Sequence, residues 1–232
     1  MDRFERTKLV LGDDADKLSE KHVVVFGVGG VGSYVVEALA RCGVGKITIV
    51  DNDIVSKSNI NRQLIALGST VGMRKVEVTK ARILDINPNC EVVARCEFVT
   101  AENAADFVSG KIDYVVDAID NVTAKLKIAE IAVERGVNII SCMGTGNKLD
   151  ATKFQITDIS KTHTCPLARV MRAELRKRNI NHLQVLFSTE QAIKSQTANE
   201  RTPGSVSFVP SVAGLLIAGK VVRDLIDFKV AK

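Results

Sequence analysis

The stretch VVVFGVGGVGSYVVEALARCGVGKITIVDND, residues 23–53, decides the fold. A β-branched run predicts a buried strand, spaced glycines open a helix, and a second strand ends in an acid. Gly27, Gly29 and Gly32 match the pattern G-x-G-x-x-G, and Asp51 ends the second strand. Such glycines let a backbone approach a phosphate closely, and such an acid can bind ribose hydroxyls. We expect a nucleotide-binding unit, with NAD, ATP and tight packing without a ligand all open at this point.

Short β-branched runs alternate with helical stretches through the first two-thirds of the chain. Strands are expected at HVVVFG, KITIVD, CEVVARCEFV, DYVVDAID and NIISCM, and helices from Gly30, across 70–86, near 102–108 and over 122–135. This alternation predicts an α/β fold, a Rossmann-like, doubly wound, mostly parallel sheet with helices on both faces.

The pattern changes after Cys142. A strand in FQITDIS, a basic helix in PLARVMRAELRKRN, a strand in LQVLFSTEQ and a last apolar helix suggest antiparallel additions to the sheet. We therefore expect one domain over residues 1–232. Residues 1–145 form its nucleotide-binding core, and residues 146–232 form an extension for substrate binding and dimer contacts.

Composition limits the class of protein. The 32 basic and 27 acidic residues give a net charge of +5, which permits a polyanionic partner without requiring one. The five cysteines form no C-x-x-C pair, which is typical of reduced thiols in a cytoplasmic protein and argues against a four-cysteine zinc site. No apolar region typical of a signal peptide occurs near the N-terminus. Pro210 and Lys220 bracket too short an apolar run for a bilayer, so we expect no stable membrane insertion.

Residues downstream of the glycines favour ATP over NAD. The segment NINRQ supplies Asn59, Arg62 and Gln63, and Lys75 follows. Arginine can fork onto phosphate oxygens and lysine adds a point charge, which suits a triphosphate better than the less charged pyrophosphate of NAD. Asp120 in DAIDN follows a strand, at the edge where such sheets bind ligands and where Mg²⁺ needs a carboxylate. The alternatives are a turn-stabilising Asn59, a solvated Lys75 and a helix-capping Asp120.

GVGGVG, DNDIVSKSNINRQ, Lys75 and DAIDN, in this order, resemble the adenylating domain of ubiquitin-activating enzymes and of the bacterial enzymes that activate sulfur-carrier proteins. The resemblance spans residues 1–145 and implies a site for ATP and Mg²⁺. With the glycine loop, the expected site residues are Gly27, Gly29, Gly30, Gly32, Asp51, Asp53, Asn59, Arg62, Gln63, Lys75, Asp120 and Asn121. Arg62, Lys75 and Asp120 are the expected catalytic residues, and Asp120 is the expected metal ligand.

The same resemblance implies a homodimer. In that family an arginine near the N-terminus reaches the partner subunit's ATP site, where a cation would stabilise charge on the reacting phosphate. The segment RFERTKLVLG offers Arg6 for this catalytic role, with Arg3 as the alternative. An ordinary exposed basic residue on a frayed terminus is the other interpretation.

FQITDISKTHTCPLARVMRAELRKR, VLFSTEQ and TPGSVSFVPSVAGLLIAGKVVRDL resemble one branch of that family, the dehydratases of threonylcarbamoyladenosine in tRNA. The resemblance implies carboxylate adenylation and ring closure at adenosine 37, with no protein nucleophile. Arg169, Arg172 and Arg176 share one helix face and are the expected tRNA contacts, unless that face is merely solvated. The loop over residues 195–204 either closes over the substrate pocket or only connects. Cys165, the one cysteine in a loop-like context, is expected to cap the helix or fill space, and the alternative is a catalytic cysteine that receives the acyl group as a thioester.

Two other functions remain open. The first is activation of a small ubiquitin-like sulfur-carrier protein, although the zinc-bearing form of such activators carries C-x-x-C pairs that this chain lacks. A sulfur-transfer system with a cysteine desulfurase is a further candidate partner. The second is an NAD-dependent oxidoreductase or a non-catalytic nucleotide-binding module.

Overall fold

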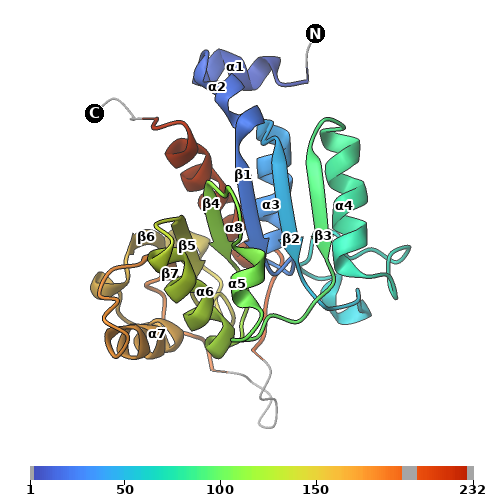
Figure 1. Ribbon diagram of the computed structural model, residues 1–232. Helices are drawn as coiled ribbons and strands as arrows, with labels where there is room; N and C mark the ends of the chain where they lie inside the picture. Colours follow the sequence, from blue (N-terminus) through green and yellow to red (C-terminus); the bar gives the residue numbers. More distant parts are fainter. Residues whose placement is uncertain (1–2, 195–202, 229–232) are drawn as a thin grey trace.

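The computed structural model describes residues 3–194 and 203–228, whose strands form one sheet. Its seven strands lie in the order β3-β2-β1-β4-β5-β7-β6 (Figure 1). The strands are β1 (His22–Phe26), β2 (Lys46–Val50), β3 (Glu91–Arg95), β4 (Tyr114–Asp117), β5 (Asn138–Cys142), β6 (Phe154–Asp158) and β7 (Gln184–Ser188). All neighbouring pairs are parallel except β6 and β7. The predicted mostly parallel sheet with an antiparallel C-terminal addition is confirmed.

Helices cover both faces of the sheet. One face carries α3 (Gly32–Cys42), α4 (Lys75–Ile86) and α8 (Phe208–Leu225), and the other carries α5 (Ala104–Phe107), α6 (Val122–Glu134) and α7 (Pro166–Arg176). The shorter elements are α1 (Glu5–Leu11), α2 (Asp14–Lys17) and the 3-10 helices η1 (Leu18–Glu20), η2 (Lys57–Asn59), η3 (Ala151–Lys153) and η4 (Ile159–Lys161). Within the described residues, no helix combines the length and the hydropathy that crossing a membrane would require.

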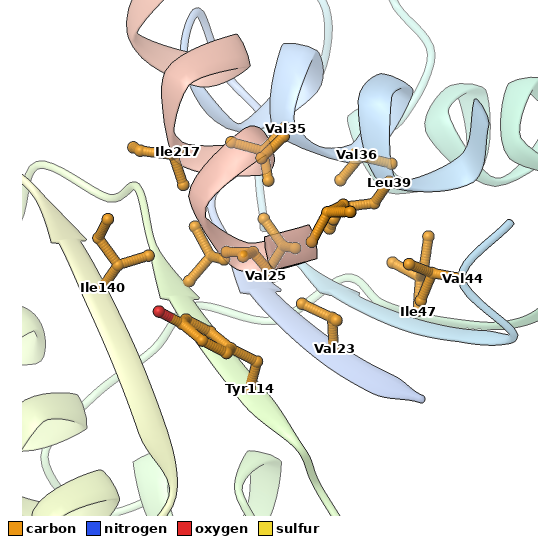
Figure 2. Packing of buried hydrophobic residues seen from close by; sticks show 14 of the residues in the cluster. Val23, Val25, Val35, Val36, Leu39, Val44, Ile47, Tyr114, Ile140 and Ile217 are labelled. Atoms are coloured by element: carbon orange, nitrogen blue, oxygen red, sulfur yellow. The ribbon is translucent and has the colours of Figure 1, made fainter. Parts of the chain in front are cut away.

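The central strand shows why both faces need helices. Val23 and Val25 of β1 join the core under α3 and α8, while Val24 and Phe26 join the core on the opposite face. Successive side chains of a strand point to opposite faces, so an unbroken apolar run is buried on both sides. Figure 2 shows the first of these cores, in which Leu39 and other α3 residues lie above the strands. Each fully buried aliphatic side chain contributes roughly 1.5–3 kcal/mol.

Some predicted boundaries are wrong. The helix expected across 70–86 begins only at Lys75, because Gly72 has φ +91° and Arg74 pairs with Ile54 in an isolated β-bridge. A residue in the left-handed region cannot continue a right-handed helix. The third strand ends at Arg95, short of its predicted end at Val99. The two short helices α1 and α2 were not predicted at all.

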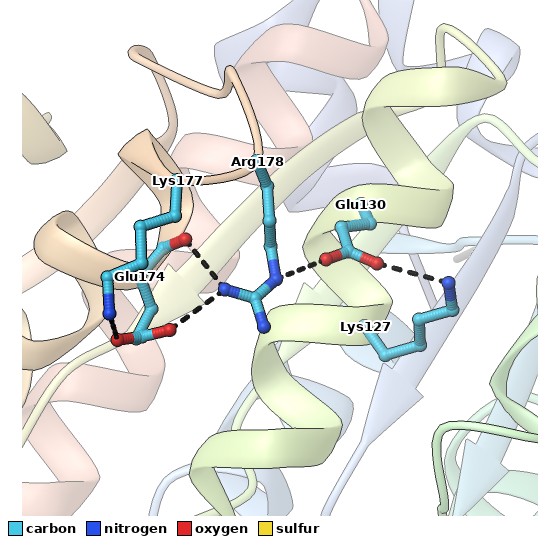
Figure 3. Close-up of polar contacts among 5 residues, drawn as sticks. All are labelled: Lys127, Glu130, Glu174, Lys177 and Arg178. Atoms are coloured by element: carbon cyan, nitrogen blue, oxygen red, sulfur yellow. Dashed lines mark hydrogen bonds and ion pairs between the residues drawn. The ribbon is translucent and has the colours of Figure 1, made fainter.

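An ionic chain joins α6 to the end of α7 on the surface (Figure 3). Arg178 Nε lies 2.5 Å from Glu130 Oε1 on α6, and Arg178 Nη1 lies 3.0 Å from Glu174 Oε2 on α7. Lys127 and Lys177 extend the chain, at 3.0 Å and 2.6 Å from Glu130 and Glu174. Exposed pairs of this kind contribute about 0–1 kcal/mol each, so the two helices are held mainly by apolar packing.

A glycine allows α8 to pack closely on α3. A Cβ atom added to Gly214 would lie 2.4 Å from the carbonyl oxygen of Val31 and 2.8 Å from Tyr34 Cβ. On the same helix, a Cβ atom at Gly219 would meet only the end of the Arg223 side chain, at 3.5 Å. The backbones of α3 and α8 therefore touch at Gly214 and not at Gly219.

We expect Gly214→Ala to lower the free energy of unfolding by about 1–3 kcal/mol, because the added methyl group overpacks the crossing of the two helices. The matched control Gly219→Ala should leave stability unchanged or raise it by up to about 1 kcal/mol through helix propensity. Urea denaturation of both variants and the wild type measures the difference. Equal stability of the two variants would show that the crossing is not tight.

Candidate active site

A cavity of about 570 Å³ opens at the carboxyl edge of the sheet, where β1 and β4 end side by side. The chain leaves these two strands in opposite directions, which makes this the switch point at which doubly wound sheets bind ligands. The predicted residues that line it are Gly27, Gly29, Gly30, Asp51, Asp53, Asn59, Arg62, Gln63, Lys75, Asp120 and Asn121. The fold therefore brings together eleven of the twelve residues expected at the ATP site.

Gly32, the twelfth, is not among the residues lining the cavity. A Cβ atom at Gly32 would lie 1.7 Å from the carbonyl oxygen of Gly27, so this glycine serves the packing of the loop against α3. Gly27 has φ +82°, and its Cβ atom would lie 2.9 Å from the carbonyl oxygen of Ala118 beyond β4. Both glycines bring backbones together, and Gly27 also lines the cavity beside Gly29 and Gly30.

Asp51 holds the floor of the cavity in shape. Its Oδ2 accepts a hydrogen bond from the backbone N–H of Val28 at 2.8 Å, and its Oδ1 accepts one from the N–H of Asp53 at 2.9 Å. Each oxygen keeps a further lone pair, so the carboxylate can still accept hydrogen bonds from ribose hydroxyls.

Lys75 begins α4 with its side chain only 5% exposed, which makes the solvated-face alternative wrong. Its Nζ atom lies 2.7 Å from Asp53 Oδ2, on a carboxylate whose side chain is 59% exposed at the cavity rim. A buried ammonium needs such a partner because burial of an unpaired charge is costly. The pair places one positive charge inside the cavity and a carboxylate beside it.

The NINRQ segment supplies an arginine and two amides. Asn59 caps the 3-10 helix η2, with its Oδ1 accepting from the Ser56 N–H at 3.1 Å, so the expected turn-stabilising role is present while Asn59 also lines the cavity. Gln63 is 7% exposed, and its Oε1 is buried without a hydrogen-bond partner within the described part of the chain. A donor group of a bound ligand, or a water molecule, would satisfy this buried acceptor at the cavity wall.

Asn121 caps the N-terminus of α6, so the Asp120 carboxylate is not used as the helix cap. The side-chain oxygen of Asn121 accepts from the Ala124 N–H at 3.0 Å, so the helix-capping alternative for Asp120 is wrong. Asp120 is exposed at the end of β4 and lines the cavity. In the described residues, no group of three or more His, Cys, Asp or Glu side chains could hold a metal alone. One carboxylate beside a phosphate site fits Mg²⁺, which binds through one or two carboxylates together with substrate phosphates.

A buried ion pair lies directly behind Asp120. Lys125 and Asp117 both have side chains that are 0% exposed, with Lys125 Nζ 2.9 Å from Asp117 Oδ2. Lys125 also donates to the carbonyl oxygens of Ile119 at 3.1 Å and Cys142 at 2.8 Å, and Ser141 Oγ donates to Asp117 Oδ2 at 2.5 Å. With one ion pair and two hydrogen bonds, Lys125 therefore joins the ends of β4 and β5 to the turn that carries Asp120.

Lys125→Met should lower the free energy of unfolding by about 3–5 kcal/mol, because it leaves Asp117 charged and buried without its partner. The control Lys127→Met, on the same helix, removes only a partly exposed pair with Glu130 and should cost about 0–1 kcal/mol. Urea denaturation compares the two variants. Similar small losses would mean that water or a neighbouring group replaces Lys125.

Residues that the sequence analysis missed complete the cavity. They include Glu97, Phe98 and Val99 after β3, Thr145 and Gly146 after β5, and Ser205 and Pro210 from the C-terminal part. The position after a parallel strand was a usable signal for the first two groups. No local sequence signal indicated the third group. Of the loop expected over residues 195–204, only 203 and 204 lie within the described residues, and both line the cavity.

The predicted arginines outside the cavity lie in two places. Arg6, on α1, and Arg3, which donates to the Ile86 carbonyl oxygen at 2.5 Å, lie by the amino edge of the sheet, away from their own chain's cavity (Figure 1). On α7, Arg169 and Arg176 are exposed, while Arg172 Nη1 donates to the carbonyl oxygen of Thr162 at 2.9 Å and is partly committed to the fold.

The cysteines near the site are buried. Cys165 precedes α7 and is 4% exposed among core residues, in agreement with the expected filling role. Burial raises the pKa of the Cys142 thiol to about 12, so this thiol stays protonated at neutral pH. Neither cysteine is placed to accept an acyl group from a substrate in the cavity.

The sheet order and the glycine loop at its switch point define an α/β protein of the Rossmann class. The model of the ThiF family matches residues 3–232. The chain is 47% identical to the tRNA threonylcarbamoyladenosine dehydratase of Bacillus subtilis, over 97% of this chain and 94% of that protein. It is 39% identical to the Escherichia coli protein of the same name, over 84% of this chain and 76% of that protein. The chain belongs to the ThiF family.

Solved structures agree with this assignment. The crystal structure of Escherichia coli tRNA N6-threonylcarbamoyladenosine dehydratase, TcdA, in complex with ATP matches with a TM-score of 0.90 at 33% identity, covering 97% of this chain and 94% of that chain. The complex of the same protein with AMP matches with a TM-score of 0.91 over the same shares. The similarity thus extends through the C-terminal part of the fold.

Proposed function

We propose that this chain is an ATP-dependent dehydratase that cyclises threonylcarbamoyladenosine at adenosine 37 of tRNA. One observation carries the proposal: Arg62, Lys75 and Asp120, far apart in the sequence, meet the glycine loop at one cavity. Similarity to dehydratases from Bacillus subtilis and Escherichia coli supports the substrate, and the ATP complex of the E. coli relative supports the nucleotide.

The lining residues suggest how ATP lies in the cavity. Asp51 binds the ribose hydroxyls, and the backbone of Gly29 and Gly30 faces the phosphates near the start of α3. Phe98, which is 55% exposed at the cavity, offers a flat apolar surface to the adenine ring. Arg62 and Lys75 supply the positive charges for the phosphates.

The chemistry follows from the substrate's carboxylate, which is a poor electrophile because its leaving group would be oxide. A carboxylate oxygen attacks the α-phosphorus of ATP, pyrophosphate leaves, and the acyl group becomes an acyl-adenylate. A nucleophile within the same modified base then attacks the acyl carbon and loses its proton, and AMP leaves as the ring closes. The net change is loss of water from the base and cleavage of ATP to AMP and pyrophosphate.

The protein's part is positioning and charge stabilisation. The positive charges of Arg62 and Lys75 stabilise the negative charge that develops on the leaving pyrophosphate. Asp120 would bind Mg²⁺, which neutralises phosphate charge when bound. The attacking group is tethered to the electrophile at a high effective concentration, so ring closure needs no protein nucleophile. The burial of Cys142 and Cys165 agrees with such a mechanism.

The proposed partner of α7 is the tRNA itself. Arg169 and Arg176 are exposed on α7, whose first turn lies near the cavity wall: a Cβ atom at Gly144 would be 3.7 Å from Cys165 Sγ. They can contact tRNA phosphates, with Arg172 contributing less because it binds Thr162. We place the reaction in the cytoplasm with its tRNA. A sulfur-transfer system with a cysteine desulfurase stays a predicted partner.

The wild-type protein, given ATP, Mg²⁺ and tRNA carrying threonylcarbamoyladenosine, should release pyrophosphate and form the cyclic base. Arg62→Ala and Lys75→Ala should each lower kcat/KM about 10²–10³-fold, because each removes a cation that stabilises developing charge. Pyrophosphate release and nucleoside analysis of the digested tRNA measure both steps. Arg41→Ala, which removes an exposed pair with Glu37, is the control and should retain wild-type turnover.

A second arm replaces the tRNA by a small carrier protein with a C-terminal Gly-Gly. Pyrophosphate release with the carrier and none with the tRNA would overturn the proposed substrate in favour of sulfur-carrier activation. The yeast adenylyltransferase and sulfurtransferase UBA4 resembles this chain less extensively, at 34% identity over 64% of this chain and 34% of that protein.

We also propose a homodimer in which Arg6 serves the partner subunit's site. Leu9 and Val10 on α1 are 82% and 74% exposed, and they lie beside a groove of about 470 Å³ that includes Leu215 of α8. Large exposed apolar side chains in one place mark a contact surface. A second copy covering this surface would place Arg6, which lies on the same helix α1, at the interface.

Arg6→Ala and Arg62→Ala should each be inactive alone, while their co-expressed mixture should recover about a quarter of wild-type turnover. Half of randomly paired dimers are mixed, and each mixed dimer keeps one complete site if Arg6 acts across the interface. Turnover of the mixture against each single variant measures the effect. Full activity of Arg6→Ala alone would remove it from catalysis, and the same experiment with Arg3→Ala tests the alternative arginine.

A further inference from the structure

Within the NINRQ segment, Ile60 and Asn61 do not line the cavity, but the side chain of Asn61 accepts a hydrogen bond from Arg62, which does. Arg62 Nη1 donates to the carbonyl oxygen of Ser58 at 2.8 Å and to Asn61 Oδ1 at 2.8 Å. The two hydrogens of Nη1 are thereby used by the protein. Since guanidinium is planar, fixing one nitrogen on two acceptors fixes the plane of the whole group.

This arrangement leaves the other edge of the guanidinium for a ligand. The Nε–H group and one Nη2–H group point in parallel along that edge, which is the geometry that binds two oxygens of a phosphate or carboxylate at once. Neither nitrogen donates to another group within the described residues. Both acceptors on Nη1 are uncharged, so Arg62 keeps its full positive charge.

Asn61 is itself held by the C-terminal part of the chain. Its Nδ2 donates to the carbonyl oxygen of Ser205 at 2.9 Å, a residue that lies 144 positions away and lines the cavity. The amide thus has a donor on its oxygen and an acceptor on its nitrogen, which determines its orientation. Arg62, Asn61 and Ser205 form a continuous chain of hydrogen bonds from the arginine to the C-terminal extension.

A second asparagine, Asn147, binds the neighbouring residue Gly204 of the same C-terminal segment. The N–H of Asn147 donates to the Gly204 carbonyl oxygen at 2.8 Å, and the Gly204 N–H donates to Asn147 Oδ1 at 2.6 Å. Asn147 has φ +56°, a conformation that asparagine and glycine adopt more readily than other residues. Beside it, a Cβ atom at Gly146 would lie 2.8 Å from Pro203 Cβ, so the two chain segments are in close contact.

We propose that Asn61 is a positioning residue for Arg62 and that Asn147 sets the segment on which Asn61 rests. Together they connect Arg62, which binds the nucleotide's phosphates, to the C-terminal wall of the cavity. This inference rests on the proposed function in one respect only, namely that ATP occupies the cavity. Asn61 touches no substrate; it acts by keeping the free edge of the arginine turned towards the phosphates.

The test is a double-mutant cycle on the affinity for ATP with Mg²⁺, measured by calorimetry on the full chain. Asn61→Ala should weaken binding about tenfold, because a hydrogen bond to a charged group is lost and Arg62 gains rotational freedom. Arg62→Ala should weaken it more. In the Arg62→Ala background, the further change Asn61→Ala should have no effect, which a merely structural role would not produce.

Asn147→Gly keeps the backbone conformation and the backbone bond to the Gly204 carbonyl oxygen while removing the side-chain bond to the Gly204 N–H, and it should weaken ATP binding severalfold in the wild type but not in Asn61→Ala. Asn138→Ala, an exposed asparagine at the amino end of β5, is the matched control and should bind ATP as the wild type does. Thermal melting of each variant checks that the fold is kept, as expected for the exposed Asn61.

The outcomes separate this inference from the proposed function. Wild-type affinity in Asn61→Ala, or additive losses in the double variant, would overturn the positioning role while leaving the ATP site intact. Absence of ATP binding in the wild type would overturn both. ATP binding without turnover of the modified tRNA would overturn the proposed substrate alone, since the cycle is measured on the nucleotide.

Discussion

The ion pair and the two hydrogen bonds of the Lys125 ammonium group are the interaction on which the site depends. They join Asp117 at the end of β4, the carbonyl oxygen of Ile119 in the following turn and that of Cys142 at the end of β5. A charge with no exposed surface tolerates few other arrangements, because each lost partner leaves an unpaired buried group. The main effect of the pair is therefore to fix one backbone geometry at the switch point, where Asp120 lies, and not to add net stability.

The two cations of the cavity are held in different ways. Lys75 is buried and lies against Asp53, so its charge is largely neutralised until an anion enters. Arg62 is bound through uncharged oxygens and keeps its charge. Together with the glycine backbone, they make a site that is attractive to phosphates without burying an unpaired lysine. The same division explains why the arginine needs an orienting neighbour, whereas the lysine is oriented by its ion pair.

The central sheet and most of the cavity lining could be predicted because their signals are local. β-branched runs, spaced glycines and polar residues just after strands specify the carboxyl edge, and all of these were found in the sequence. The loop over residues 195–204 was offered as a cover of the pocket, but the contacts that hold its end there could not be predicted, since those of Gly204 with Asn147 and of Ser205 with Asn61 join segments far apart in the chain. Lys125 was missed although its position on the buried face of α6, in phase with Ile128 and Ala132, was a usable signal. The start of α4 was misjudged because the left-handed Gly72 interrupts a stretch with good helical composition.

The packing of α8 against α3 has a consequence for how the chain is made. α3 leaves the ribosome long before α8, the last described helix. Val31, Val35 and their neighbours are therefore uncovered on that side until α8 has been made. A nascent chain stalled before Phe208 would present that bare strip to chaperones and to other nascent chains, so a chain truncated there is an aggregation hazard rather than a slightly shorter enzyme.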